Sequence, residues 1–159
     1  YVEGFQRLLS QGGGRIVQMD ADLSHDPAVL PTLLDSRADL VLGSRYVPGG
    51  GTRNWSAARR LLSRFGSLYA SAWLGLPYRD LTGGFKVWQG PLLAEVLKTP
   101  IQAEGYAFQV EMTWRAARLG ASIEEVPILF TERVEGQSKM NRAIALEAAW
   151  LVPALRFRR

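Results

Sequence analysis

The sequence predicts an α/β fold with a mostly parallel sheet and flanking helices, and two observations carry this prediction. Two short apolar runs, residues 15–19 and 39–43, have the length and residue types of buried strands. A helix begins between them at Asp26 and Pro27, because aspartate caps a first turn and proline suits the first helical position. Strand, helix and strand joined by short connections are typical of a parallel sheet.

The other elements follow from apolar periodicity and from the positions of glycine and proline. Helices are expected over residues 1–11, 26–36, 55–74, 90–98, 106–119 and 141–159. Further strands are expected over residues 85–88 and 123–130, the second near a sheet edge because Pro127 interrupts it. Residues 47–52 and 131–140 are expected to be loops. The helix over 55–74 carries an apolar stripe, and the tryptophans are expected mainly in the core. Residues 1–159 are predicted to form one domain.

Composition excludes several classes of site. The chain has 159 residues, of which 47% are hydrophobic and 21% charged, so it is long enough and apolar enough to bury a full core. The absence of cysteine excludes disulfides, thiolate metal sites and cysteine nucleophiles. His25 is the single histidine, which excludes a histidine-rich metal site. Sixteen of the 19 basic residues are arginine, whose planar fork grips phosphate; a GC-rich genome is the alternative explanation.

The residues at the start of the chain are not expected to be a secretory leader. Residues 1–11 are amphipathic and lack an apolar run, and no stretch approaches the ~18 apolar residues of a spanning helix. Because the first residue is Tyr1, the chain is expected to be a fragment or a processed product.

An acidic pair is the strongest local feature. Asp20 and Asp22 directly follow the strand over 15–19, at the sheet edge where α/β folds bind ligands. Two carboxylates repel each other unless a cation lies between them, and Mg²⁺ or Mn²⁺ prefers oxygen ligands. Such an ion usually bridges to a phosphate-bearing substrate. A helix-capping turn is the alternative, although Asp26 already supplies the cap. His25 is interpreted as structural rather than as a base.

Three further groups suit anions, and each has an ordinary alternative. Arg45 ends the second strand and points into the same crevice, unless it pairs with an acid such as Asp39. Arg59 and Ser63 lie one helical turn apart, a spacing that suits phosphate but also a solvated helix face. Residues 131–139 alternate basic, small and hydroxyl side chains, which suits either a lid that closes on anions or an exposed loop.

Six sequence blocks together resemble one family. They are VQMDADLSHDP (17–27), LGSRY (42–46), DLTGGFK (80–86), GYAFQVEM (105–112), EVPI (125–128) and FTERVEGQSKM (130–140). In this order they resemble the polyprenol-phosphate (dolichol-phosphate) mannosyltransferases of inverting glycosyltransferase family 2. The resemblance implies the Rossmann-like nucleotide-diphospho-sugar transferase (GT-A) fold.

The chain departs from the family pattern at three places. The family begins with a strand carrying a Pro-Thr-Tyr-Asn-Glu-like motif that binds the base and ribose, and this motif is absent here, so the chain is expected to be the C-terminal part of a catalytic domain. Many members carry aspartate at the position of Glu132 and glutamine at that of Ser24, a metal ligand. Ser24 therefore leaves the third metal ligand open.

The resemblance implies transfer of mannose from GDP-mannose to a polyprenyl (dolichyl-type) monophosphate with inversion, for glycan, glycolipid or glycoprotein synthesis. It implies that Asp20, Ala21 and Asp22 touch the donor, that Asp22, Asp20 and Ser24 hold Mg²⁺ or Mn²⁺, that Arg45, Arg133 and Lys139 bind phosphates, and that Arg59 and Ser63 bind the acceptor phosphate. Asp22, Arg45 and Arg133 would be catalytic. The leaving GDP gains negative charge, which a metal ion and arginines stabilise. The acceptor is already an anion, so no strong base is needed. The role of Asp80 stays open.

The lipid acceptor implies a membrane partner. Residues 141–159 form an apolar stretch ending in Arg156, Arg158 and Arg159, which suits a helix at a membrane surface or a buried core helix. The expected location is the cytoplasmic face of a membrane, held peripherally or by a separate membrane-anchoring domain or subunit. No nucleic-acid partner is expected.

Three alternatives stay open. Another sugar, such as glucose, could replace mannose. The chain could bind lipid phosphate without catalysis; by itself it is expected to aggregate and to bind GDP-mannose weakly. A haloacid-dehalogenase-type phosphatase also carries Asp-x-Asp after a buried strand, but it needs a downstream lysine and acidic pair, for which Lys86, Lys98 and residues 124–125 are poor candidates.

Overall fold

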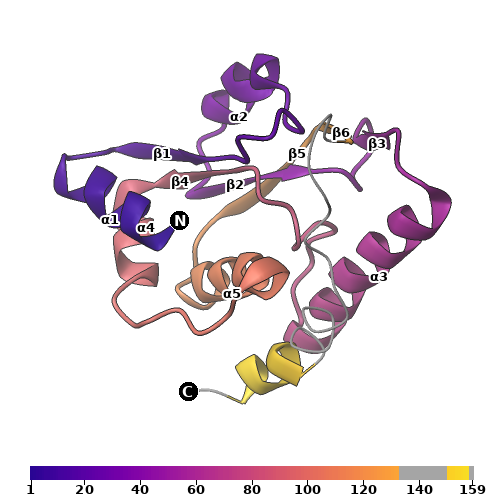
Figure 1. Ribbon diagram of the computed structural model, residues 1–159. Coiled ribbons are helices and arrows are strands. Elements are labelled where there is room, and N and C mark those ends of the chain that lie inside the picture. The colour runs from indigo at the N-terminus through magenta and orange to yellow at the C-terminus, as the bar shows by residue number, and fades with distance from the viewer. Residues whose placement is uncertain (133–149, 158–159) are drawn as a thin grey trace.

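A four-stranded sheet forms the centre of the computed structural model, which describes residues 1–132 and 150–157 (Figure 1). In spatial order its strands are β1 (Arg15–Gln18), β4 (Lys86–Gln89), β2 (Leu40–Ser44) and β5 (Ile123–Pro127). Strand β4 is antiparallel to both β1 and β2, and β2 is parallel to β5. Strands β1, β2 and β5 therefore run in one direction, which confirms the mostly parallel α/β sheet.

The position of β4 differs from the simplest parallel arrangement. The two strands that begin the chain's strand–helix–strand unit, β1 and β2, do not pair, because β4 lies between them. Asp80, shortly before β4, contacts Arg45, which directly follows β2. The chain therefore returns to the sheet at the end where β2 leaves it, and β4 must run back antiparallel.

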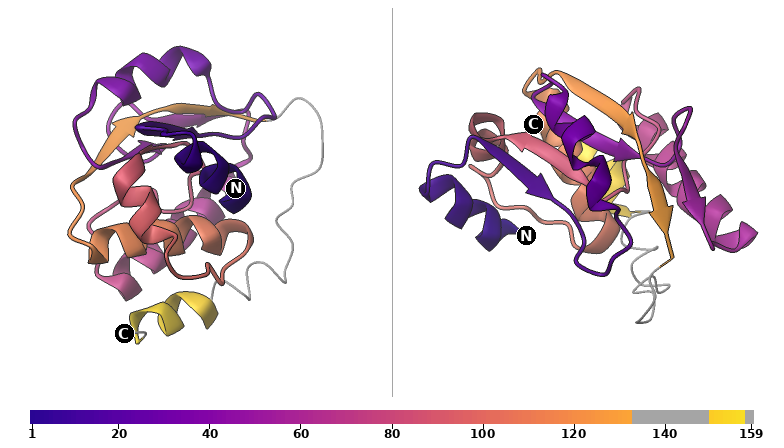
Figure 2. Two further views of the ribbon diagram at one scale, coloured as in Figure 1. Left: turned by 90° about the vertical axis from the view of Figure 1, so that its left-hand side faces the viewer. Right: turned by 90° about the horizontal axis from the view of Figure 1, so that it is seen from above.

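Helices cover both faces of this sheet (Figures 1 and 2). They are α1 (Val2–Ser10), α2 (Leu30–Asp35) preceded by a short 3₁₀ turn η1 (Pro27–Val29), α3 (Ala57–Leu74), α4 (Gly90–Val96) and α5 (Gly105–Arg118). Residues 150–156 are also helical. The Asp26 carboxylate accepts a hydrogen bond from the Ala28 backbone N–H at 2.9 Å, which confirms the predicted N-cap.

Alternating side chains of β2 divide the core between the two faces. Leu40 and Leu42 pack with Met112 of α5 on one face. Val41 packs with Leu33 of α2 on the other. Because every residue of β2 is buried, this strand is the centre of the fold, as its continuous apolar run predicts.

A small second sheet includes residues that were expected in loops, because its strands overlap the end of the loop predicted over 47–52 and the start of the loop predicted over 131–140. Strands β3 (Gly51–Arg53) and β6 (Leu129–Thr131) pair in parallel, with Thr52 opposite Phe130. The strand predicted over 123–130 is thus divided near Pro127 into β5 and β6, each in a different sheet. The expected edge position of this segment is confirmed, since β5 is the last strand of the larger sheet.

Helix α3 presents its apolar stripe to the outside. Its buried residues are the small Ser63, Ser67 and Ala70. Its large apolar side chains are exposed, with fractions of 73% for Leu61, 51% for Leu62, 62% for Phe65, 65% for Leu68 and 41% for Trp73. The small side chains let this side of the helix lie close to the loops beneath it. The large apolar side chains of the stripe therefore lie on the outer side of the helix, away from the core.

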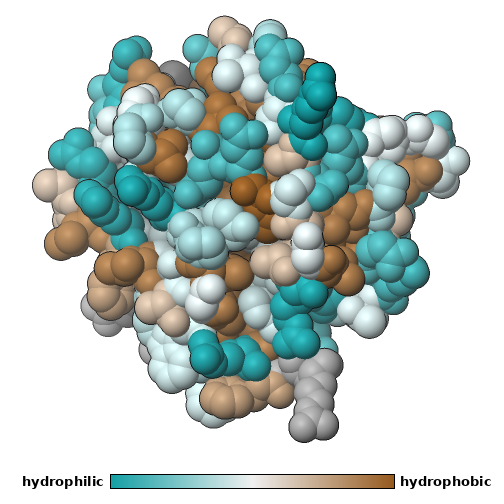
Figure 3. Space-filling view, turned by 180° about the vertical axis from the view of Figure 1, so that it is seen from behind, coloured by the Kyte–Doolittle hydropathy of each residue, from teal (hydrophilic) through white to brown (hydrophobic). Residues whose placement is uncertain are grey.

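The expectation of core tryptophans is therefore only partly confirmed. Trp55 and Trp88 are buried, but Trp73 and Trp150 are exposed. On the face opposite to the view of Figure 1, apolar and polar side chains are interspersed (Figure 3).

Residues 141–159 were expected to form either a helix at a membrane surface or a buried core helix, and residues 150–157 show part of the answer. Val152 and Leu155 are buried, while Trp150 and Phe157 are exposed, so residues 150–157 pack on the domain through one side. The rest of that segment, and Arg133 and Lys139, lie outside the described residues. Within the described part of the chain, no helix is long and apolar enough to cross a membrane.

Candidate active site

The acidic pair lies where β1 ends, in a turn held by its own hydrogen bonds. Asp20 and Asp22 are half-buried and Ala21 between them is exposed. The Asp20 carboxylate accepts a hydrogen bond from the Tyr1 hydroxyl at 2.6 Å. Asp22 Oδ1 accepts the Ser24 backbone N–H at 3.1 Å. The turn therefore fixes both carboxylates at the end of the sheet, as predicted.

His25 supports this turn from beneath. Its Nδ1 accepts the backbone N–H of Asp20 at 3.1 Å, so the ring proton resides on Nε2. The ring stacks on Phe85, with centroids 4.9 Å apart, and meets the edge of Phe130 at 5.1 Å. Burial lowers the pKa of His25, although Asp20 and Asp22 oppose that shift. These contacts fit the structural role predicted for the histidine.

The donor set of the turn fits a divalent cation that is shared with a substrate. Asp20 and Asp22 supply carboxylate oxygens, and the Ser24 hydroxyl is buried without a hydrogen-bond partner in the structure. Among the described residues no group of three or more histidine, aspartate or glutamate side chains could hold a metal. Mg²⁺ commonly binds one or two carboxylates together with substrate phosphates, and this turn suits that mode.

Arg45 is fixed at the end of β2 by a buried ion pair. Its Nε and Nη2 each lie 2.7 Å from an oxygen of Asp80, and its backbone N–H donates to the same carboxylate at 2.9 Å. Nη2 also donates to Thr82 Oγ1 at 3.0 Å. Burial opposes the charge of Arg45, but the Asp80 carboxylate outweighs burial and raises the arginine's pKa. The partner is thus Asp80, not the Asp39 considered from the sequence.

The Asp80 loop is itself anchored from β5. The Glu125 carboxylate accepts the backbone N–H groups of Arg79 and Asp80, both at 2.9 Å. Although Asp80 is buried, Arg45 lowers its pKa, so Asp80 stays ionised. The role that the sequence left open for Asp80 is therefore, in this structure, to hold Arg45 and the loop.

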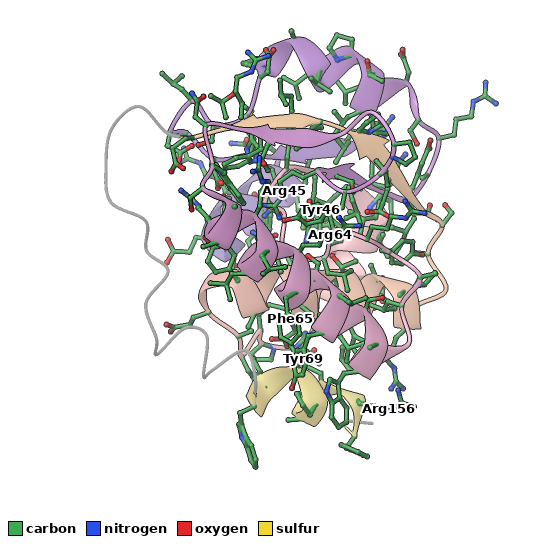
Figure 4. All side chains as sticks on the ribbon, turned by 90° about the vertical axis from the view of Figure 1, so that its right-hand side faces the viewer. Arg45, Tyr46, Arg64, Phe65, Tyr69 and Arg156 are labelled. Carbon is green, nitrogen blue, oxygen red and sulfur yellow. The ribbon has the colours of Figure 1, made fainter. Side chains whose placement is uncertain are left out.

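Arg45 and Tyr46 lie beside α3, the helix that carries Arg59 and Ser63 (Figure 4). Ser63 Oγ accepts a hydrogen bond from the Tyr46 hydroxyl at 2.7 Å. Arg59 forms an ion pair with Glu132, at the end of β6, and its Cζ lies 4.3 Å from the Trp55 ring centroid. The Arg45 Cζ lies 5.4 Å from the same ring centroid. The structure thus brings Arg45 and Arg59 together around Trp55, and Ser63 contacts Tyr46, the residue after Arg45.

The acidic turn and the arginines occupy the same end of the sheet. The loop after Asp80 joins them, because a Cβ added at Gly84 would lie 3.3 Å from Asp20 Oδ1 and one at Gly83 would lie 3.5 Å from Asp80 Oδ1. The Phe130 ring also lies between them, in contact with both His25 and Arg45. The candidate active site therefore combines two carboxylates with two guanidinium groups.

Sequence reasoning missed Trp55, Thr82 and Glu125 in this arrangement. Thr82 and Glu125 fall in the DLTGGFK and EVPI blocks, which were noted as family features without a role for either residue. The signal for Trp55 is its position just before the helix that carries Arg59, but it was assigned to the core with the other tryptophans.

Two curated proteins are similar to this chain over most of its length. Undecaprenyl-phosphate mannosyltransferase of Micrococcus luteus is 47% identical over 150 residues, which are 93% of this chain and 62% of that protein. Polyprenol monophosphomannose synthase of Mycolicibacterium smegmatis is 43% identical over 155 residues, 96% of this chain and 58% of that protein. The chain thus spans about three fifths of the length of these relatives. No protein-family model matches it.

Solved structures show the same fold. Glucosyl-3-phosphoglycerate synthase from Mycobacterium tuberculosis, in complex with Mn²⁺ and UDP-glucose, superposes with a TM-score of 0.60 at 18% identity, over 97% of this chain and 52% of that one. The same enzyme in complex with phosphoglyceric acid gives a TM-score of 0.57 at 19% identity, over 97% of this chain and 53% of that one. Over nearly its whole length the chain is therefore a homologue of the polyprenol-phosphate mannosyltransferases, with the fold of the GT-A glycosyltransferases.

Proposed function

We propose that this chain forms the acceptor side and the metal turn of an enzyme that transfers mannose from GDP-mannose to a polyprenyl monophosphate with inversion. The observation that carries the proposal is that Asp20 and Asp22 lie at the same end of the sheet as Arg45 and Arg59, linked through His25 and Phe130, in a homologue of enzymes named for this product. Carboxylates suit a metal-bound diphosphate and guanidinium groups suit an acceptor phosphate.

In this reaction an oxygen of the acceptor phosphate attacks the anomeric carbon of mannose. The bond from that carbon to the diphosphate oxygen breaks, and its electron pair leaves with GDP. Because the attacking oxygen is already anionic, no side chain has to remove a proton. This fits the turn, where the histidine accepts a backbone hydrogen bond through Nδ1.

The side chains described here position the two anions. Arg59 and Ser63 bind the acceptor phosphate, and Asp80 holds the plane of the Arg45 guanidinium toward the same region. Asp20 and Asp22, with Ser24, would hold Mg²⁺ or Mn²⁺, which when bound supplies positive charge to the leaving diphosphate. Arg133 and Lys139, which lie outside the described residues, are proposed to bind phosphates.

Membrane association follows from the exposed stripe of α3. Leu61, Phe65 and Leu68 are more than half exposed and alternate with the exposed arginines Arg60 and Arg64. An apolar face bordered by cations suits the surface of an anionic membrane, where the lipid acceptor resides. We infer that the protein works peripherally at the cytoplasmic face of a membrane.

The phosphatase alternative finds no support in the geometry. Lys86 is fully buried and donates to Gln109 and Thr113 of α5. Glu124 accepts a hydrogen bond from Ser36, and Glu125 anchors the Asp80 loop. Lys98 pairs with Glu95 on the surface, so each of the named downstream candidates is engaged with a residue other than Asp20 and Asp22.

The test is transfer of radiolabelled sugar into a lipid extract by the full-length protein, with GDP-mannose and UDP-glucose compared side by side. Transfer is expected from GDP-mannose, to require Mg²⁺ or Mn²⁺, and to be lost in Asp22→Asn. Full turnover in excess chelator would contradict the metal role, and transfer from UDP-glucose alone would replace mannose by glucose.

A further inference from the structure

Trp55 lies beside both arginines of the candidate site, and its indole N–H has no partner. The side chain is 9% exposed, and Nε1 is buried without a hydrogen bond in the structure. Its ring centroid lies 4.3 Å from Arg59 Cζ, 5.4 Å from Arg45 Cζ and 5.3 Å from the Phe130 centroid. The indole is therefore held in place by packing while its donor is left unused.

An unused buried donor needs an explanation. Leaving such a group unpaired costs about 1–3 kcal/mol, and folded proteins pair the great majority of them. The other buried tryptophan, Trp88, has such a partner, because its Nε1 donates a hydrogen bond to Gln18 Oε1 at 3.2 Å. Since the neighbours of Trp55 are two guanidinium groups, the partner that suits all three donors is an anionic oxygen.

One of these arginines, Arg59, is already paired with a carboxylate of the chain. Glu132 pairs with Arg59 and has 31% of its side chain exposed. Its backbone N–H donates to the Arg53 carbonyl at 3.0 Å, which fixes the residue at the end of β6. Glu132 Oε1 accepts a hydrogen bond from Arg59 Nη1, while the indole N–H of Trp55 stays unpaired.

A phosphate monoester has three terminal oxygens and can serve both donors. We propose that Trp55 is a phosphate-binding residue of the acceptor site, and that Glu132 is the internal carboxylate that the acceptor phosphate displaces from Arg59. This inference rests on the proposed function, which supplies the polyprenyl phosphate. Its consequence is selectivity, because a carboxylate ligand gains nothing over Glu132, whereas a phosphate gains the bond to Trp55.

Binding to Trp55 can be observed directly through its indole N–H. In the ¹H–¹⁵N spectrum of the full-length protein, Trp55→Phe identifies the signal by its loss. Titration with farnesyl phosphate is expected to move this signal downfield, as a new hydrogen bond forms. Farnesol and acetate are expected to leave it in place, and Arg59→Ala is expected to abolish the response. An unmoved Trp55 signal at concentrations that shift other signals would overturn the proposal.

Kinetics separate a binding role from a structural one. Trp55→Phe keeps an aromatic ring beside the arginines and removes only the N–H, so the acceptor KM is expected to rise roughly five- to tenfold while the donor KM stays unchanged. Glu132→Gln is expected to lower the acceptor KM, because the competing charge is gone. Trp114→Phe, half-buried in α5 beside Arg118, is the matched control and is expected to change neither.

Failure of the proposed function and failure of the Trp55 assignment give different experimental results. If the protein transfers no mannose, the proposed function falls, while the indole titration still reports whether phosphate binds at Trp55. If the enzyme is active and Trp55→Phe raises both KM values equally, or neither, then Trp55 does not bind the acceptor phosphate and only the inference falls.

Discussion

The buried ion pair between Arg45 and Asp80 fixes the Arg45 guanidinium in the candidate site. Both side chains are almost fully buried, and three hydrogen bonds join them, one from the arginine's own backbone. Removing one partner of such a pair leaves a buried charge without compensation, which is far more costly than losing an exposed ion pair. The sequence alone could place Arg45 at a strand end, but it could not show that Asp80, 35 residues later, returns to meet it.

Asp80→Asn is therefore expected to lower the free energy of unfolding by about 3–5 kcal/mol. Glu95→Gln is the control, because Glu95 pairs with Lys98 on the surface with side chains 50% and 66% exposed. That change is expected to cost less than about 1 kcal/mol. Urea unfolding at neutral pH measures both. Equal, small effects of the two substitutions would show that the buried pair does not stabilise the fold.

A second residue-scale prediction concerns the space beside Asp20. A Cβ at Gly84 would lie 3.3 Å from Asp20 Oδ1, so Gly84→Ala is expected to displace the carboxylate and weaken Mn²⁺ binding, measured by calorimetry. Gly66 lies within α3 with nothing within 4 Å of an added Cβ. Gly66→Ala is expected to leave Mn²⁺ affinity unchanged and to stabilise the helix by about 0.5–1 kcal/mol. Unchanged Mn²⁺ affinity in Gly84→Ala would separate Asp20 from the metal.

At the scale of elements, a buried polar network joins β1, β4 and α5. Lys86 Nζ donates to the Gln109 carbonyl at 2.8 Å and to Thr113 Oγ1 at 2.9 Å. Gln18 links the network to β1 through Gln109, at 2.9 Å, and accepts from Trp88. Burial lowers the pKa of Lys86 to about 7. The apolar residues of β4 predict the strand from the sequence. A lysine at a buried strand position is not expected from that pattern, so the sequence could not predict the partners of Lys86 in α5.

The free energy of unfolding is expected to depend on pH because of Lys86. Between pH 7 and pH 10.5 the unfolded chain holds a proton on Lys86 that the folded chain lacks, so the free energy of unfolding rises with pH. The expected slope is about 1.4 kcal/mol per pH unit, and below pH 7 this contribution is constant.

Lys86→Met removes the titrating group. The difference in unfolding free energy between the parent and Lys86→Met, from urea titrations, is therefore expected to grow in the parent's favour from pH 7 to pH 9. Lys98→Met, at an exposed position, should show no such trend. A constant difference for Lys86→Met over this range would mean that the lysine stays charged in the folded state.

At this scale, the sequence predicted the order of the elements well but not their arrangement in space. Caps, glycine ends and apolar runs located the helices of the described chain and the strands of the larger sheet, because those signals are local, but they missed β3. They could not show that β4 lies between β1 and β2, since that depends on where residues 75–85 return to the sheet. They could not orient α3 either, because its large side chains and its small ones both form continuous faces.

At the scale of the whole molecule, residues of the candidate site and the exposed apolar stripe share one helix, α3. The buried side of α3 carries Ser63 and Ser67, which bond to Tyr46 and Thr82 beside the arginines. The opposite side carries the exposed stripe. A helix that binds the phosphate on one side and a membrane on the other would place the acceptor headgroup at the level of the site, with its lipid chain still in the bilayer.

This arrangement predicts a specific loss of membrane binding. Replacing Leu61, Phe65 and Leu68 together by glutamine is expected to reduce cosedimentation with anionic vesicles severalfold, while the melting temperature stays nearly unchanged because all three side chains are already exposed. The control replaces three exposed leucines elsewhere, Leu8, Leu34 and Leu119. If both triple variants lose vesicle binding equally, general surface hydrophobicity and not α3 governs the interaction. If neither loses it, the membrane contact lies outside the described face, and α3 serves the acceptor site alone.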